Sequence, residues 1–322
     1  MRIFIIFLLL FTTLYSSSKR EKENLSYMYK IDEFRIFYDK KGKNKLLKKN
    51  KDDCNNNNIP DYIENIGLKL QVTSKILQES FHFISPLQSN RYKNKVKYID
   101  VHVLNMKNNG SGGDGIIYYK YKALLKNESA SLSIKLSRNL RAKTQTPPHE
   151  LFHLYQNGYT MFKNRWYTEG TARWSEYILK KGTGSRKKLP STQNELERVL
   201  NKTYDTKYMW RRLAYLLDKN NGKFLYPKGI DYKIKGYAQV IEDNRIYGYD
   251  FMRIFLENLS KMDKIASHDY GIPIYDWPEE LQKSSQNNKY ILKALTQSIR
   301  QMNKTANKEL LLFLGTVDRY IK

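Results

Sequence analysis

Two histidines and a glutamate stand close together in the run HELFH, which covers His149 to His153. On a helix, positions i and i+4 lie on one face a turn apart, so both imidazoles can reach one metal ion while Glu150 lies beside it. A further acid, Glu169, follows in the run WYTEGTARWSE. Catalytic zinc takes three protein ligands and leaves a position open for water. The spacing therefore predicts a zinc centre held by His149, His153 and Glu169.

A lone HExxH run often arises by chance, so the second run decides the interpretation. It reads W-x-x-E-G-x-A-x-x-x-E, and we expect its small residues, Gly170 and Ala172, to let this helix approach the HELFH helix closely. Glu150 is the expected general base, taking a proton from water and passing it to the leaving amine. Glu176, two turns after Glu169, is a candidate to orient a ligand, although a purely structural ion pair is equally compatible with its place.

These motifs resemble the third-ligand helix and active-site helix of the gluzincin metallopeptidases. Upstream, FRIFY at 34 to 38 and DCNNNNIPDYIE at 53 to 64 are similar to the opening of a group of secreted bacterial gluzincins, so the resemblance covers about residues 33 to 180. It implies a zincin-like fold and hydrolysis of peptide bonds in proteins, peptides or cell-wall peptides. The interval between His153 and Glu169 is shorter than in the zinc aminopeptidases, so that subfamily's substrate preference does not carry over.

The resemblance also implies two features around the zinc. Zincins pair extended substrate with the edge strand before the active-site helix, and 129 to 137 alternates suitably, although an ordinary core strand fits this segment equally well. Zincins also use a Tyr or His to stabilise the oxyanion. The candidates in this sequence are Tyr247 and Tyr249, followed by Tyr237 and His268.

The segment from 53 to 64 has the spacing of an EF-hand-type calcium loop. Oxygen ligands would come from six positions: Asp53, Asn55, Asn57, the Ile59 carbonyl, Asp61 and Glu64. Asn58 replaces the usual glycine, which is tolerable because Asn adopts left-handed backbone geometry. With only three carboxylates we expect weak calcium binding, and an Asn-rich turn without calcium remains an equal alternative.

The N-terminus predicts export. An apolar run from Ile3 to Tyr15 follows Arg2 and ends in three serines, which is typical of a signal peptide over 1–18. Thirteen apolar residues are few for a bilayer core of ~30 Å, so cleavage is favoured over anchoring. We expect a secreted or periplasmic monomer. Cys54 is the only cysteine, which excludes an intramolecular disulfide.

The chain of 322 residues carries a net charge of +25. Its basic residues are mainly Lys spread along the chain, with few Arg beside aromatics, so the charge predicts a solvated surface rather than a specific nucleic-acid site. Weak attraction to anionic cell surfaces remains open.

Periodicity predicts an α+β fold with two lobes behind the leader. Residues 19–160 would form an antiparallel or mixed sheet lobe with the calcium-like loop and the HELFH helix, and 161–322 a mostly α-helical lobe that carries Glu169. Expected strands are 34 to 38, 96 to 104, 115 to 121 and 129 to 137; a helix is expected from 61 to 83, and the Gly-rich run from 108 to 115 reads as a turn. The expected later helices span 195–200, 208–217, 249–261, 290–302 and 307–321. Besides the peptidase, a non-catalytic surface or binding protein that retains a zincin fold is the alternative, and the intact Glu150 favours the enzyme.

Overall fold

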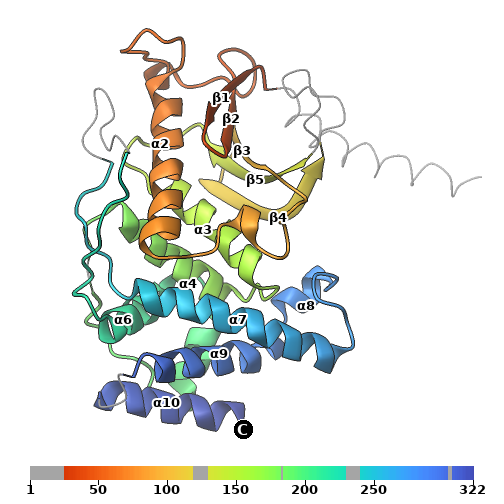
Figure 1. Ribbon diagram of the computed structural model, residues 1–322, viewed down its shortest axis with the longest axis vertical. Coiled ribbons are helices and arrows are strands. Elements are labelled where there is room, and N and C mark those ends of the chain that lie inside the picture. The colour runs from red at the N-terminus through yellow and green to blue at the C-terminus, as the bar shows by residue number, and fades with distance from the viewer. Residues whose placement is uncertain (1–24, 119–129, 183, 230–239, 304–306) are drawn as a thin grey trace, which may run out of the picture. The chain divides into compact units, whose positions relative to one another are not determined.

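The computed structural model describes residues 25–118, 130–182, 184–229, 240–303 and 307–322. These residues form a mixed α+β fold that divides into two compact units (Figure 1). The first unit comprises the described part of residues 1–67 and of 94–144. The second comprises the described part of 68–93 and of 145–322. The predicted leader over 1–18 lies outside the described residues.

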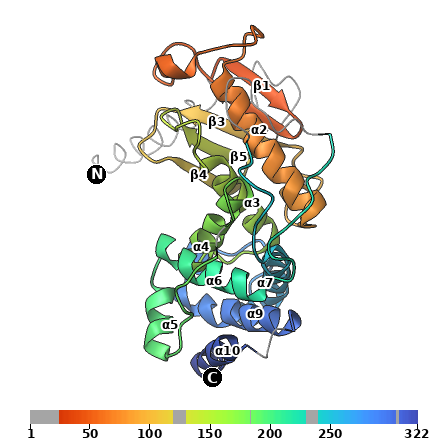
Figure 2. The same cartoon turned by 90° about the vertical axis from the view of Figure 1, so that its left-hand side faces the viewer.

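The first unit is built on a five-stranded mixed sheet with the order β1-β2-β3-β5-β4. Its strands are β1 (Tyr27–Ile31), β2 (Phe34–Tyr38), β3 (Tyr98–Leu104), β4 (Gly110–Tyr118) and β5 (Ala130–Ser137). β2, β3 and β5 run parallel to one another, whereas β1 and β4 pair antiparallel on the outside (Figures 1 and 2). β2 is buried at every position, as is typical of strands in the interior of a mixed sheet.

A buried ion pair crosses the middle of this sheet. Arg35 Nε lies 2.6 Å from Asp100 Oδ1, and the two residues are register partners on β2 and β3. Ser131 on β5 donates its hydroxyl to the other carboxylate oxygen at 2.9 Å. Three neighbouring strands are therefore joined through one carboxylate in the interior, where an unpaired charge would be very costly.

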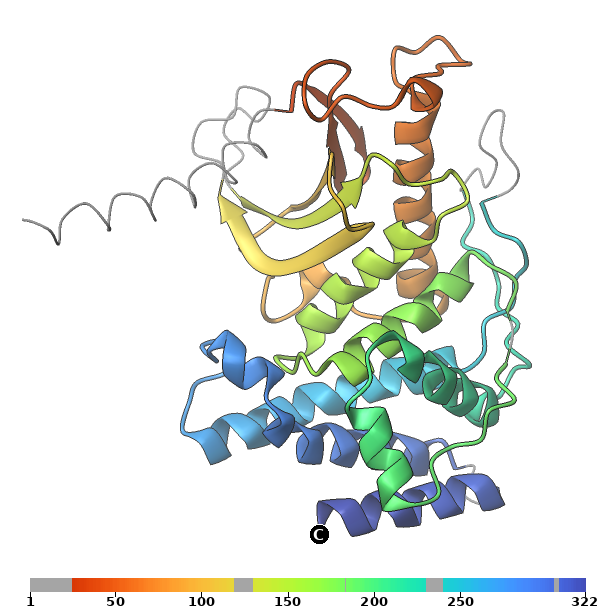
Figure 3. The ribbon, with the colours of Figure 1, turned by 180° about the vertical axis from the view of Figure 1, so that it is seen from behind.

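One expectation about this sheet was wrong, and one open alternative is resolved. The Gly-rich run is not a turn: β4 begins at Gly110, and its backbone pairs with β5 through a register shift between Gly113 and Ile117. Backbone hydrogen bonds need no side chains, so an edge strand can consist largely of glycine. The described part of the segment from 129 to 137, which is β5, is not at the edge, because it lies between β3 and β4 (Figure 3). The alternative of an ordinary core strand is therefore confirmed.

The long helix predicted over 61 to 83 is α2 (Asp61–Lys75), continued by a π-helical turn over Ile76–Ser80. The boundary between the units falls within it. Short 3-10 turns are η1 (Lys48–Asn50) in the first unit and η3 (Pro86–Gln88) in the second.

The second unit is otherwise helical in its described residues. Its helices are α3 (Thr146–Tyr159), α4 (Arg165–Ser175), α5 (Gln193–Leu200), α6 (Lys207–Leu217), α7 (Tyr249–Tyr270), α8 (Glu279–Lys283), α9 (Asn288–Gln301) and α10 (Lys308–Ile321). Its remaining 3-10 turns are η4 (Glu176–Ile178), η5 (Tyr204–Thr206) and η6 (Ser285–Asn287). α7 packs along α9, and α9 and α5 pack against α10 (Figures 1 and 2). None of the helices in the described part of the chain is both long and apolar enough to cross a membrane.

Candidate metal centre

Helix α3 positions the two histidines. It begins at Thr146, and Pro147 and Pro148 occupy its first turn, where a missing N–H costs no hydrogen bond. His149 and His153 then fall one turn apart on the same face, with ring centroids 4.8 Å apart. The two prolines therefore mark the start of this helix.

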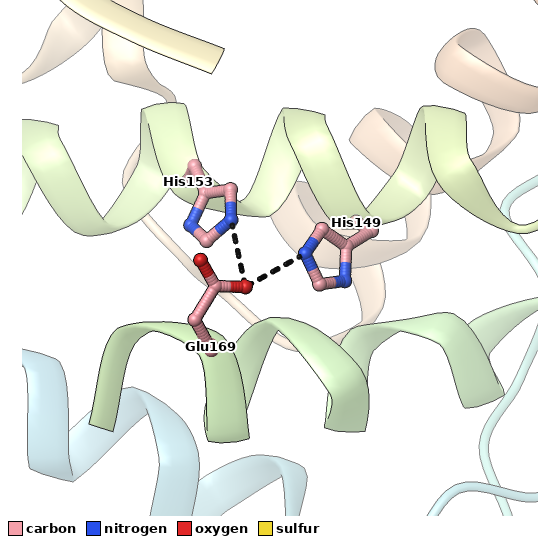
Figure 4. Close-up of side chains that lie close together, drawn as sticks. All are labelled: His149, His153 and Glu169. Atoms are coloured by element: carbon pink, nitrogen blue, oxygen red, sulfur yellow. Dashed lines mark ion pairs between the residues drawn. The ribbon is translucent and has the colours of Figure 1, made fainter. Parts of the chain in front are cut away.

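Helix α4 brings Glu169 to the same point (Figure 4). Glu169 Oε2 lies 3.3 Å from His149 Nε2 and 3.8 Å from His153 Nε2. One ligand atom from each residue lies within 4.8 Å of the others, the only such group of His, Cys, Asp or Glu among the described residues. The three side chains singled out by the sequence therefore converge in space.

The donor set fits zinc. Tetrahedral zinc with bonds of about 2.1 Å requires ligand atoms about 3.4 Å apart, which is close to both separations from Glu169 Oε2. That oxygen is buried and faces the two imidazoles, and no other described residue donates a hydrogen bond to it, so it has a lone pair to share with a cation. Two imidazole nitrogens with one carboxylate oxygen suit zinc or another transition metal better than calcium or magnesium, which prefer oxygen ligands.

Gln156 fixes the tautomer of His153. Its amide nitrogen donates to Thr168 O at 2.8 Å and to Thr171 Oγ1 at 2.6 Å, so its oxygen faces His153 Nδ1 at 2.7 Å. An amide oxygen only accepts hydrogen bonds, so His153 Nδ1 must carry the proton. The Nε2 lone pair of His153 is consequently directed toward Glu169. The sequence analysis missed Gln156, although its place three residues after His153 puts it on the same helical face.

Glu176 plays the corresponding part for His149. Its Oε1 lies 3.1 Å from His149 Nδ1 and accepts a hydrogen bond from Arg173 Nη1 at 2.9 Å, while its Oε2 lies 3.4 Å from Lys180 Nζ. Burial tends to raise the pKa of Glu176, but these neighbours lower it below its ordinary value, so the carboxylate stays ionised. Carboxylates that hold the outer nitrogen of a ligating histidine are a common support of metal sites.

The electrostatics differ at the two histidines when no cation is present. Burial lowers the pKa of His149, but the carboxylates of Glu169 and Glu176 outweigh it and raise the pKa to about 9. Burial and the charge of His149 lower the pKa of His153 to about 4. At neutral pH the protonated ring of His149 therefore lies between two carboxylates, and a bound divalent cation would displace the proton on its Nε2.

Glu150 is buried beside the cluster on α3, with 6% of its surface exposed. Its charge contributes to the raised pKa of both His149 and Tyr204, so its carboxylate acts on the same small volume as the ligands. The predicted base is therefore located next to the three predicted ligands.

Tyr204 is the aromatic residue at this site that the sequence analysis missed. It opens η5, and its ring centroid lies 6.4 Å from that of His149 and 5.1 Å from the guanidinium carbon of Arg173. Burial, followed by the charge of Glu169, raises the pKa of Tyr204, so its hydroxyl remains protonated at neutral pH. Only the packing of α4 against η5 identifies Tyr204 among the 26 tyrosines.

The tyrosines named from the sequence have other surroundings. Tyr249 stacks on Phe81 with centroids 4.4 Å apart, and its hydroxyl accepts a hydrogen bond from Asn220 at 2.6 Å. The ring of Tyr247 contacts that of Tyr215 at 5.1 Å. His268 lies in the last turn of α7 with 92% of its side chain exposed. Tyr237 lies outside the described residues.

Gly170 has a different packing role from the one expected. A β-carbon at this position would overlap Trp210 of α6 and come within 2.5 Å of Thr206 Oγ1 of η5. The glycine therefore allows α4 to approach α6 and η5, not α3. Thr168 and Thr171 of α4 contact α3 through Gln156.

The loop from 53 to 64 lies in the first unit and is closed by its own hydrogen bonds. The backbone amides of Asn57 and Asn58 donate to Asp53 at 3.1 and 2.8 Å, and the side-chain amides of Asn55 and Asn57 donate to Glu64. Ile59 N donates to Asn57 Oδ1, and Cys54 N to Asp61. Asn58 adopts the expected left-handed geometry with φ 67°. Calcium binding by this loop stays a prediction.

Comparisons with known proteins add no family to this picture. No family model matches the chain, and no curated protein matches it. The assignment of the metal centre rests on the geometry of its side chains.

Proposed function

We propose that this protein is an exported zinc-dependent peptidase with a zincin-like fold of the gluzincin type. The observation that carries the proposal is the convergence of His149, His153 and Glu169, with Glu150 beside them on the same helix. His149 and His153 would hold zinc through Nε2 and Glu169 through Oε2. A bound zinc ion would supply Lewis acidity, lowering the pKa of a water ligand toward ~7 and polarising a substrate carbonyl.

The chain's own residues would supply the proton transfers. Glu150 accepts a proton from the attacking water and returns it to the leaving amine, so one carboxylate serves as base and then as acid. Its place on α3 supports this role, because it lies between the two histidines in the same helical turn. Tyr204 takes the place of Tyr247 and Tyr249 as the proposed hydrogen-bond donor to the developing oxyanion, because its ring centroid lies 6.4 Å from that of His149.

Zinc analysis of the purified protein tests the ligands. We expect one zinc per chain, and loss of that zinc in three single variants, His149→Ala, His153→Ala and Glu169→Ala. Glu280→Ala, which removes an exposed carboxylate from α8, is the control and should keep its zinc. A Glu169→Ala protein with full zinc would remove Glu169 from the ligand set, and a different resident metal would replace zinc in the proposal.

The Glu150→Gln variant tests the reaction. It should keep zinc and fold but lose peptidase activity on unfolded proteins and peptide mixtures by at least ~10²-fold, because the amide cannot accept the proton. Activity of the parent should disappear with a chelator and return with zinc. If the zinc-loaded parent cleaves nothing that Glu150→Gln leaves intact, including cell-wall peptides, the protein is better described as an exported binding protein with a zincin fold.

A further inference from the structure

A cavity with a volume of about 780 Å³ lies in the second unit, apart from the metal ligands. Parts of α5, η5, α6 and α10 line it, together with the segment before α5. Apolar side chains contribute to its wall, namely Leu189, Val199, Met209 and Leu312. Leu312 is 52% exposed, so part of this apolar surface faces solvent.

Positive charge dominates the lining. Five cationic residues contribute to the cavity: Lys187, Lys188, Arg198, Lys202 and Lys308. Two of the three lining acids already have partners, because Glu309 pairs with Arg212 at 2.5 Å and Glu195 forms the capping box of α5. Asp205 is the third. The cavity therefore has more cationic than anionic groups free to meet a ligand.

Several of these cations are available. Arg198, Lys202 and Lys308 are exposed, and none of them forms an ion pair with another residue in the described part of the chain. Like charges gathered around one hollow repel each other, and an anionic ligand relieves that repulsion. The arrangement thus favours a ligand with more than one negative charge.

The cavity shares a short structural element with the metal centre. Asp205 and Thr206 of η5 line the cavity, while Tyr204 of the same turn lies beside His149. One turn therefore contributes residues both to the cavity wall and to the surroundings of His149. A binding site at this place suits the part of a substrate beyond the bond that is cut.

We propose that this cavity binds an acidic segment of the polypeptide substrate; the inference rests on the proposed peptidase function. The mixture of lysines with an apolar wall matches a peptide in which carboxylates alternate with apolar side chains. A phosphate-rich polymer fits less well, since one arginine offers little bidentate recognition and the apolar wall would stay unused. The metal centre would then cut acidic substrates in preference to neutral ones.

Peptide binding to the zinc-loaded Glu150→Gln protein tests the cavity without turnover. The two probes are a fluorescein-labelled octapeptide of alternating Glu and Leu and the same peptide with Gln in place of Glu. Fluorescence anisotropy measures the binding of each. We expect the acidic peptide to bind at least tenfold more tightly. Adding Lys202→Glu with Lys308→Glu should weaken acidic-peptide binding about tenfold, because two attractions become repulsions.

A charge-matched variant controls for the high net charge of the protein. Lys264→Glu with Lys293→Glu reverses two exposed lysines on α7 and α9, outside the cavity lining, and should leave binding nearly unchanged. Equal weakening by both double variants would overturn the cavity as the binding site. Tighter binding of polyphosphate or single-stranded RNA, lost in Lys202→Glu with Lys308→Glu, would overturn the peptide as the ligand.

Cleavage assays separate this inference from the peptidase proposal. If the parent cleaves acidic and neutral peptides equally and the cavity variant does so too, the acidic-substrate inference fails and the peptidase stands. If the acidic peptide binds in the cavity but no peptide is cut, the peptidase proposal fails, and with it the substrate role of the cavity, while the anionic-ligand site itself stands.

Discussion

Glu176 Oε1 lies 3.1 Å from Nδ1 of His149, so the nitrogen of this ring that faces away from Glu169 is held by a second carboxylate. The contact joins η4 to α3 and orients the imidazole before any cation arrives. It also concentrates negative charge behind His149, which makes this imidazole a stronger electron-pair donor to a metal ion.

Replacing Glu176 with Gln should weaken zinc binding about 10- to 100-fold, because the amide keeps the shape but loses the charge behind His149. Competition with a chromogenic chelator measures the affinity. Glu280→Gln is the matched control on an exposed part of α8. Unchanged zinc affinity in Glu176→Gln would reduce Glu176 to a structural partner of Arg173 and Lys180.

Tyr204→Phe should lower kcat by about 10²- to 10³-fold with little change in KM or zinc content, since it removes only a donor to the developing oxyanion. Tyr249→Phe serves as the control, because it deletes a hydroxyl that pairs with Asn220 instead. A loss of similar size in both variants would point to a general packing effect and remove Tyr204 from the reaction.

Gly170→Ala should destabilise the protein by about 1–3 kcal/mol, because the added carbon collides with Trp210 and Thr206. Gly315→Ala in α10 is the matched control: its β-carbon would come no closer than 3.7 Å to Arg319 Nη1, so helix propensity alone should stabilise it by up to about 1 kcal/mol. Urea unfolding of both variants measures the difference. A more stable Gly170→Ala protein would contradict the tight packing of α4 on α6.

Asp263 predicts a pH dependence of stability. Burial raises its pKa from an ordinary 3.8 to about 8, although Thr160 Oγ1 and Met161 N both donate hydrogen bonds to it. The folded protein keeps this proton to a higher pH than the unfolded chain, so its contribution to stability is full below pH 4 and is lost as pH rises toward 8. For this single group the slope should not exceed about 1.4 kcal/mol per pH unit.

Urea unfolding of the chelator-treated protein at pH 5 and pH 8 measures this effect. Asp263→Asn cannot titrate, so its stability should change less between the two pH values than that of the parent. Asp276→Asn, at an exposed position, should behave like the parent. An Asp263→Asn protein with the parent's full pH dependence would show that other groups cause it.

The residues of the candidate metal centre could be predicted because their spacing is local. A one-turn interval on α3 fixes the geometry of His149 and His153, and Glu169 follows on the next helix. Helical periodicity likewise located most helices of the second unit, because amphipathic faces leave a regular pattern in the sequence. The hydrogen-bond partner of His153 could have been found in the same way, because Gln156 lies three residues after it on the same helix.

The rest depends on contacts that no local pattern encodes. Tyr204 reaches His149 only because η5 packs on α4, and the partner of Gly170 is set by Trp210, far along the chain. β4 could not be distinguished from a turn, because its glycines form a strand through backbone pairing with β5 alone. The order of strands, and with it the interior place of β5, likewise follows from pairing between distant segments.

The proposed zinc ligands, their hydrogen-bond partners and Glu150 all lie in one uninterrupted stretch of chain, from His149 to Lys180. A fragment that contains this whole stretch would still carry every proposed zinc ligand. Unfolding of α3 and α4 would separate all of these ligands at once. The stretch is therefore a natural piece to graft onto another helical scaffold. The host would have to replace the indole of Trp210 and the hydroxyl of Thr206, against which the bare face of Gly170 rests.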